Sequence, residues 1–171
     1  MKPAELERLS KETLIKLIEV YGKNWLTLDG LWFQGVEEKY SMDAALEIDL
    51  RMWMRQPTTE AKRIKGALNI TDNDMPTILK VIDCMTWSQA YTFEVEELAS
   101  DRAVFYYPRC RPQEQRISNG IGEFPCRPTG VACFGLAAKV INPTAEVECI
   151  FCPPGPHPTD CWCKWQLTIQ P

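Results

Sequence analysis

The chain has 171 residues, of which 45% are hydrophobic and 25% are charged, and its formal net charge is −4 at pH 7. This length and balance predict one globular domain with a sizeable core, with two small subdomains as the alternative, and they exclude a disordered chain. The acidic charge disfavours a nucleic-acid partner, and no apolar run is long enough for a signal peptide or a membrane span, so we expect a cytoplasmic protein.

Helical periodicity dominates the first half of the chain. Apolar residues recur at helical spacing up to Tyr21, from a start at Ser10 or, equally, near Pro3. Gly22 is expected to break or kink this helix, and residues 23–40 continue the apolar stripe beyond it.

Three shorter helices are predicted after this long one. Asp43 is expected to cap the first of them, which ends before Pro57. Thr58 or Thr59 should cap the second, and residues 75–85 form the third.

Strand patterns dominate the second half. Residues 89–97 alternate between apolar and polar, and residues 103–107 supply the partner strand of a hairpin. Residues 130–141 are apolar on most sides and contain small side chains, which predicts a buried helix lying close against a sheet. Residues 146–151 and 162–169 are two further strands, joined by a stiff turn in which several prolines remove backbone donors.

These elements predict an α+β fold. A helical N-terminal half packs on an antiparallel sheet, and the sheet is made of two β-hairpins that flank a buried helix. We assign residues 1–86 to a helical subdomain and residues 87–171 to a cysteine-rich α+β subdomain, the two forming one compact domain.

Residue types that bind soft metals are concentrated in residues 146–165. Four of the eight cysteines and the only histidine fall there. In a reducing compartment these cysteines should be thiols or metal ligands, and zinc takes thiolate and imidazole ligands in a tetrahedron. We predict a zinc site, with an iron–sulfur cluster or inert buried thiols as alternatives. The expected ligands come from this set: Cys110, Cys126, Cys149, Cys152, His157 and Cys163.

Carboxylates also fall within the apolar stripes of the N-terminal helices. Helical spacing places Asp29 between two indoles and Asp49 beside a third, so desolvation should raise their pKa values and suit them to acid–base work. The alternative is an aspartate paired with Arg51, Arg63 or a helix N-terminus, which only ties helices together. The predicted ligand pocket contains Trp25, Asp29, Trp32, Glu37, Asp49 and Trp53, and Trp87, Phe93 and Tyr106 could add apolar lining.

Two further hypotheses concern single side chains. His157 could activate Cys149 or Cys126 as a nucleophile. The arginines at positions 109, 111, 116 and 127 form either a solvated basic loop or a site for a carboxylate or phosphate.

Two resemblances add expectations. Glu146, Cys149, Cys163 and Trp165 match the end of the vinyl-reductase-type (4-vinyl reductase) small-molecule-binding domain, which the C-terminal half resembles. That resemblance implies a hydrophobic ligand and zinc held by cysteines, although Thr159-Asp160-Cys161 stands where the domain often has a glycine–aspartate pair.

The second resemblance spans most of the chain. The segments NWLTLDGLWFQGVEEKY (24–40), AKRI (61–64), FPC (124–126) and CPPGPHP (152–158) resemble an uncharacterised family of cysteine-rich cytosolic proteins. That family is similar to L-2-amino-thiazoline-4-carboxylate hydrolase-like proteins, but no catalytic residue can be transferred from them.

Together these features predict a protein that binds or senses a partly apolar small molecule and has a structural zinc site. The alternative is a hydrolase that acts on a small carbon–nitrogen or carbon–sulfur substrate with a metal or a buried carboxylate. A structural metal domain that docks other proteins is a third option. A homodimer is compatible with the sequence.

Overall fold

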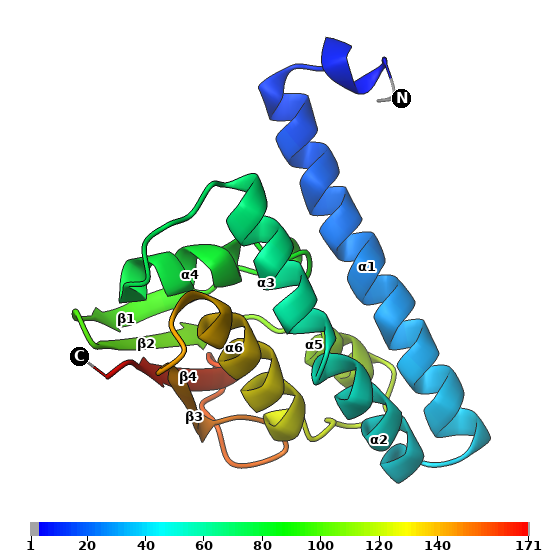
Figure 1. Cartoon of the computed structure of the whole chain (residues 1–171). Coiled ribbons are helices and arrows are strands. Elements are labelled where there is room, and N and C mark those ends of the chain that lie inside the picture. Colours follow the sequence, from blue (N-terminus) through cyan, green and yellow to red (C-terminus); the bar gives the residue numbers. More distant parts are fainter. Residues whose placement is uncertain (1–3, 171) are drawn as a thin grey trace.

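The computed structural model describes residues 4–170 (Figure 1). The helical half contains the 3-10 turn η1 (Leu6–Arg8) and the helices α1 (Lys11–Lys39), α2 (Met42–Trp53), α3 (Gln56–Ala67) and α4 (Met75–Asp83). The second half contains the 3-10 turn η2 (Ser88–Ala90), β1 (Glu94–Leu98), β2 (Arg102–Tyr107), α5 (Arg111–Ser118), α6 (Arg127–Ile141), β3 (Glu146–Phe151) and β4 (Cys163–Thr168).

The strands form one antiparallel sheet in the order β1-β2-β4-β3. Each predicted hairpin is present, and the two hairpins join where β2 pairs with β4, with Phe105 opposite Trp165. α6 lies against β3, and α2, α3 and α4 pack on α6. This arrangement confirms the predicted α+β fold, with a buried helix between the sheet and the helical half (Figure 1).

Close packing of α6 on the sheet depends on a glycine. An added Cβ at Gly130 would lie 2.4 Å from Cη2 of Trp165, a separation that no side chain tolerates. Trp165 is 1% exposed and Phe105 is fully buried, so both belong to the core under α6. The alternation of β2 turns Ala103, Phe105 and Tyr107 toward this core.

The long helix α1 begins and continues differently from part of the prediction. The Ser10 hydroxyl caps it by accepting from the Thr13 N–H at 3.2 Å, whereas a start near Pro3 lies outside the described residues. The predicted break at Gly22 is wrong, because α1 runs through it. An added Cβ there would lie 2.8 Å from the Thr86 carbonyl oxygen, so this glycine permits close contact between α1 and the segment before η2.

Three smaller predictions are also corrected. Ser41, and not Asp43, caps α2 through the Ala44 N–H at 3.1 Å. α3 begins at Gln56, with proline in its first turn, and not after Thr58 or Thr59, because proline suits the first helical turn. β1 is shorter than residues 89–97, since η2 occupies part of that segment.

Candidate functional site

A cavity of about 420 Å³ lies where the helical half meets the sheet. α1 and α2 form one part of its wall, and α5, the first half of α6, β2 and β4 form the rest. Most lining side chains are apolar or aromatic. The aromatic members are Phe33, Trp53, Trp87, Tyr91, Tyr107, Phe124, Phe134 and Trp165.

Two carboxylates face this cavity from the helical half. Asp49 accepts hydrogen bonds from Trp53 Nε1 and Thr129 Oγ1, each at 3.0 Å. Asp29 receives none from the described residues. Burial, and then the charge of Asp49, raise the pKa of Asp29 to about 7. Burial also raises the pKa of Asp49, against the two hydrogen bonds that lower it.

Three buried polar groups in the wall lack hydrogen-bond partners among the described residues. They are Trp87 Nε1, Tyr107 Oη and Trp165 Nε1, in side chains that are 6%, 4% and 1% exposed. Their rings surround Phe134, with centroid distances of 5.7, 6.1 and 4.9 Å. The two indoles face the thiols of Cys133 and Cys163, which are weak acceptors, and the donor atoms themselves are packed within the wall.

Arg116 ties α5 to α1 at the edge of the cavity. Its guanidinium donates to both Glu37 carboxylate oxygens, at 2.7 and 3.0 Å, and to the Gly122 carbonyl at 2.9 Å. This hydrogen bonding holds the pKa of Glu37 below its usual range. Arg109 pairs with Glu114, so two of the arginines in the predicted basic cluster already have carboxylate partners.

Three thiols meet beside the N-terminus of α6. Hydrogen bonds from Cys126 and Cys149, with help from Arg127, lower the pKa of Cys152 to about 6. The same contacts, together with burial, raise the pKa of Cys126 and Cys149. All eight cysteines are free thiols. Within residues 4–170, no group of three or more His, Cys, Asp or Glu side chains is arranged to hold a metal ion. The zinc site stays a prediction.

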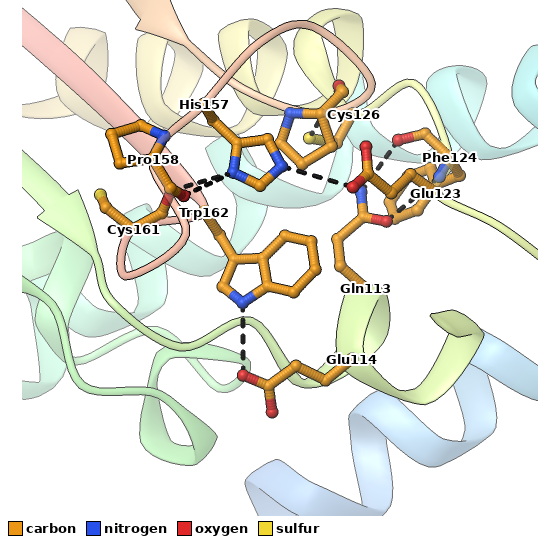
Figure 2. A network of polar contacts seen from close by, with 10 residues as sticks. Gln113, Glu114, Glu123, Phe124, Cys126, His157, Pro158, Cys161 and Trp162 are labelled. Atoms are coloured by element: carbon orange, nitrogen blue, oxygen red, sulfur yellow. Dashed lines mark hydrogen bonds and ion pairs between the residues drawn. The ribbon is translucent and has the colours of Figure 1, made fainter. Parts of the chain in front are cut away.

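The only histidine makes its polar contacts with oxygen atoms (Figure 2). His157 Nδ1 contacts the carbonyl oxygens of Pro158 and Cys161, at 2.9 and 3.2 Å, and Nε2 contacts Glu123 at 3.3 Å. Its ring lies 5.2 Å from that of Trp162. Because both ring nitrogens contact oxygens, this geometry does not support His157 as the activator of Cys149 or Cys126.

The structure brings together part of the predicted pocket. Asp29, Asp49 and Trp53 line the cavity, and Trp25 packs edge-on against Trp53 with centroids 5.7 Å apart. Glu37 pairs with Arg116, and Trp32 is 69% exposed on the outer side of α1.

Of the predicted metal ligands, Cys110, Cys126 and Cys163 line the same cavity, while Cys149 and Cys152 are buried and do not line it. Thr129 and Tyr107 also line the cavity and were not predicted from the sequence. Of the three aromatic residues expected to add apolar lining, only Trp87 does so. Tyr106 lies on the other face of β2 and donates to Glu94. Alternation along a strand could have separated Tyr106 from Tyr107, had the orientation of β2 been known.

Comparison with known proteins identifies the family. The chain belongs to the Family of unknown function (DUF6125), whose model matches residues 7–169. No curated protein and no solved structure matches the chain. This match confirms the predicted membership of an uncharacterised family over most of the chain, but the vinyl-reductase-type and thiazoline-hydrolase-like resemblances gain no support. Among the described residues, no helix has the length and apolar character needed to cross a membrane.

Proposed function

We propose that this family member is a small-molecule-binding protein and that its ligand, which is partly apolar, occupies the cavity between α1, α2 and the sheet. The observation that carries this proposal is the composition of the wall. Apolar and aromatic surface is combined there with the carboxylates of Asp29 and Asp49, and Asp29 accepts no hydrogen bond from the described residues. Ligand sites have this composition, because apolar area supplies affinity and a few polar groups supply orientation.

The size and position of the cavity support the same function. Its volume of about 420 Å³ suits a molecule with one or two rings. Its wall is shared by the helical half and the sheet, so a ligand would contact both. A ligand that stabilises one arrangement of the two halves shifts their equilibrium, which is what a sensor requires.

A pair of glycines in α1 provides a matched test. Gly30 lines the cavity and Gly35 does not, and an added Cβ at either position meets nothing within 4 Å. Gly30→Leu should therefore fill the cavity and abolish binding of a neutral aromatic probe such as 2-phenylethanol, measured by calorimetry or by NMR. Gly35→Leu makes the same change in helix propensity and should leave binding intact. Equal binding by both variants would place the probe elsewhere and overturn the proposal.

A hydrolase is the second candidate, favoured by Asp29. A carboxyl group with a pKa of about 7 beside a second carboxylate can give and take protons at neutral pH. Hydrolysis of a small amide, thioester or thiazoline by the purified protein, lost in Asp29→Asn while the substrate still binds, would support this activity. Unchanged hydrolysis in that variant would remove Asp29 from the reaction.

Zinc is our proposal for the cofactor, supported by the meeting of Cys126, Cys149 and Cys152 and by the lowered pKa of Cys152. Zinc binds thiolates, and a structural site needs a fourth ligand around the same centre. Elemental analysis should find about one zinc per chain, and the metal should be lost in Cys126→Ser and Cys152→Ser. A metal-free protein with eight titratable thiols would show instead that these cysteines pack as small hydrophobic side chains.

A further inference from the structure

The charges that face the cavity are unbalanced on its helical side. No ion pair within residues 4–170 involves Asp29 or Asp49. The cationic side chains of the lining are both on α5. Arg116 is committed to Glu37, and Arg111 is exposed. Two neighbouring carboxylates in a mostly apolar wall therefore have no compensating cation among the described residues.

The two carboxylates are presented in different ways. Trp53 and Thr129 each donate to one oxygen of Asp49, which fixes the plane of that carboxylate and still leaves lone pairs on both oxygens. Asp29 accepts no such bond from the described residues, so both of its oxygens can accept from a donor in the cavity. An ammonium group has several N–H donors, so it can serve both side chains at once.

The remaining wall suits the body of such a ligand. The electron-rich faces of aromatic rings attract cations as well as apolar groups, and Trp53 and Tyr91 line the cavity together with Asp29 and Asp49. Phe134 and its neighbouring rings supply apolar surface farther along the wall.

We infer that the cavity selects an organic cation, a protonated amine on an aromatic or apolar body, whose N–H groups donate to the carboxylates of Asp29 and Asp49. This inference rests on the proposed function and names the class of ligand that the cavity takes. Repulsion between the two carboxylates disfavours anionic ligands at the same place.

Three probes of similar shape and different charge test the inference in the intact protein: phenethylamine, 2-phenylethanol and phenylacetate. At pH 8, where Asp29 is ionised, phenethylamine should bind about tenfold or more tightly than 2-phenylethanol, because each of its hydrogen bonds is made to a charged group. Phenylacetate should bind most weakly. Calorimetry or NMR titration gives the three affinities.

Isosteric variants test whether Asp29 and Asp49 cause the tighter binding of phenethylamine. Asp29→Asn and Asp49→Asn should each reduce phenethylamine affinity toward that of 2-phenylethanol, by a larger factor than they change the affinity for the alcohol, since the alcohol carries no charge to pair with a carboxylate. Asp43→Asn, at an exposed carboxylate of α2, is the matched control and should change neither affinity. If Asp49→Asn does not fold, the comparison of the three probes on the unmodified protein still decides the question.

The outcomes separate this inference from the proposed function. Equal binding of the amine and the alcohol, with both lost in Gly30→Leu, would keep the cavity as a ligand site and overturn its selectivity for cations. Tightest binding of phenylacetate would also overturn the selectivity. Failure of all three probes to bind the unmodified protein would count against the ligand site itself.

Discussion

The cavity wall and the segment around His157 both contain polar side chains in partly buried surroundings, but they differ in how those side chains are satisfied. Around His157, the imidazole contacts Glu123 and two carbonyl oxygens, and the neighbouring Trp162 donates to Glu114 at 3.3 Å (Figure 2). In the cavity, Asp29 and three aromatic donors have no such partners among the described residues. We call the first region a closed network, because its polar groups contact one another, and the second an open one, because these polar groups have no partners among the described residues.

This difference separates structural roles from binding roles. An unpaired buried polar group destabilises the fold, so a protein keeps several of them in one wall at a cost in stability. Sites that bind ligands commonly carry such a cost, because the groups that would stabilise the empty protein are those that the ligand needs. We therefore expect changes in closed networks to reduce stability, and changes at open groups to reduce binding and in some cases to raise stability.

The largest expected loss of stability comes from breaking the closed network of Arg116. Its side chain is 4% exposed and pairs with Glu37 and with backbone carbonyls. Arg116→Ala leaves that carboxylate and those carbonyls without a donor, and should lower the free energy of unfolding by about 3–5 kcal/mol in denaturant titrations. Arg109→Ala is the control. Arg109 makes a similar two-point contact with Glu114, but its side chain is 79% exposed, so the loss should be under about 1 kcal/mol.

Removal of the Asp29 carboxylate, which is unpaired among the described residues, should instead raise the free energy of unfolding. The pKa of Asp29 is about 7 in the folded protein, against an ordinary value of 3.8. The folded state thus binds more protons than the unfolded state between these values, and stability falls as pH rises through that window. Asp29→Asn removes the dependence, and should raise the free energy of unfolding at pH 8 by at most about 4 kcal/mol.

The gain should shrink steadily as the pH is lowered toward 4, because Asp29 is then protonated in the folded protein and the cost of its buried charge disappears. Asp43→Asn should show no comparable gain at any pH. A gain for Asp29→Asn that is the same at pH 5 and pH 8 would contradict a raised pKa as its cause.

Local patterns predicted most of the fold, and they predicted the site only where it lies on one helix. The hairpins and helices follow from periodicity and from proline positions, and the pairing of Asp49 with the Trp53 indole follows from helical spacing. Thr129 and Trp165 reach the cavity only because α6 packs on β4, which no local pattern contains.

Gly22 and Tyr107 also show that a local sequence pattern does not determine which segment a residue contacts. A glycine within a helical pattern is compatible with a kink or with close contact to another segment, and only the position of the segment before η2 decides between them. Tyr106 and Tyr107 are adjacent aromatic residues on one strand, so the side that faces the cavity depends on how β2 sits in the sheet.

Two glycines of α6 test how rigid the open wall is. An added Cβ at Gly130 would lie 2.4 Å from Trp165, whereas at Gly135 it would lie 3.1 Å from Cγ1 of Val147. Gly130→Ala should lower the free energy of unfolding by about 1–3 kcal/mol and weaken probe binding, because Trp165 must move. Gly135→Ala gains the same helix propensity and should change stability by less than about 1 kcal/mol. Equal melting temperatures for the two variants would show that the Trp165 wall yields easily.

The smallest effect is expected at His157, where the closed network depends on protonation. All three oxygens around the ring are acceptors. A neutral imidazole has one N–H and can donate from only one ring nitrogen, whereas the imidazolium has two and can donate from both. The hydrogen bond to the Pro158 carbonyl, and then the contact with the Glu123 carboxylate, therefore raise the pKa of His157. Stability from this group is fully present below the ordinary histidine pKa and is lost as pH rises through the raised value.

His157→Gln should accordingly lower the free energy of unfolding by about 1 kcal/mol at pH 6. The difference from the unmodified protein should narrow toward pH 8, as followed by thermal unfolding. Glu123→Gln should show the same narrowing, since it removes the negative charge beside Nε2 and leaves the ring in place. A difference that widens with pH would mean that the neutral ring is the form bound in the native network, and would contradict the raised pKa of His157.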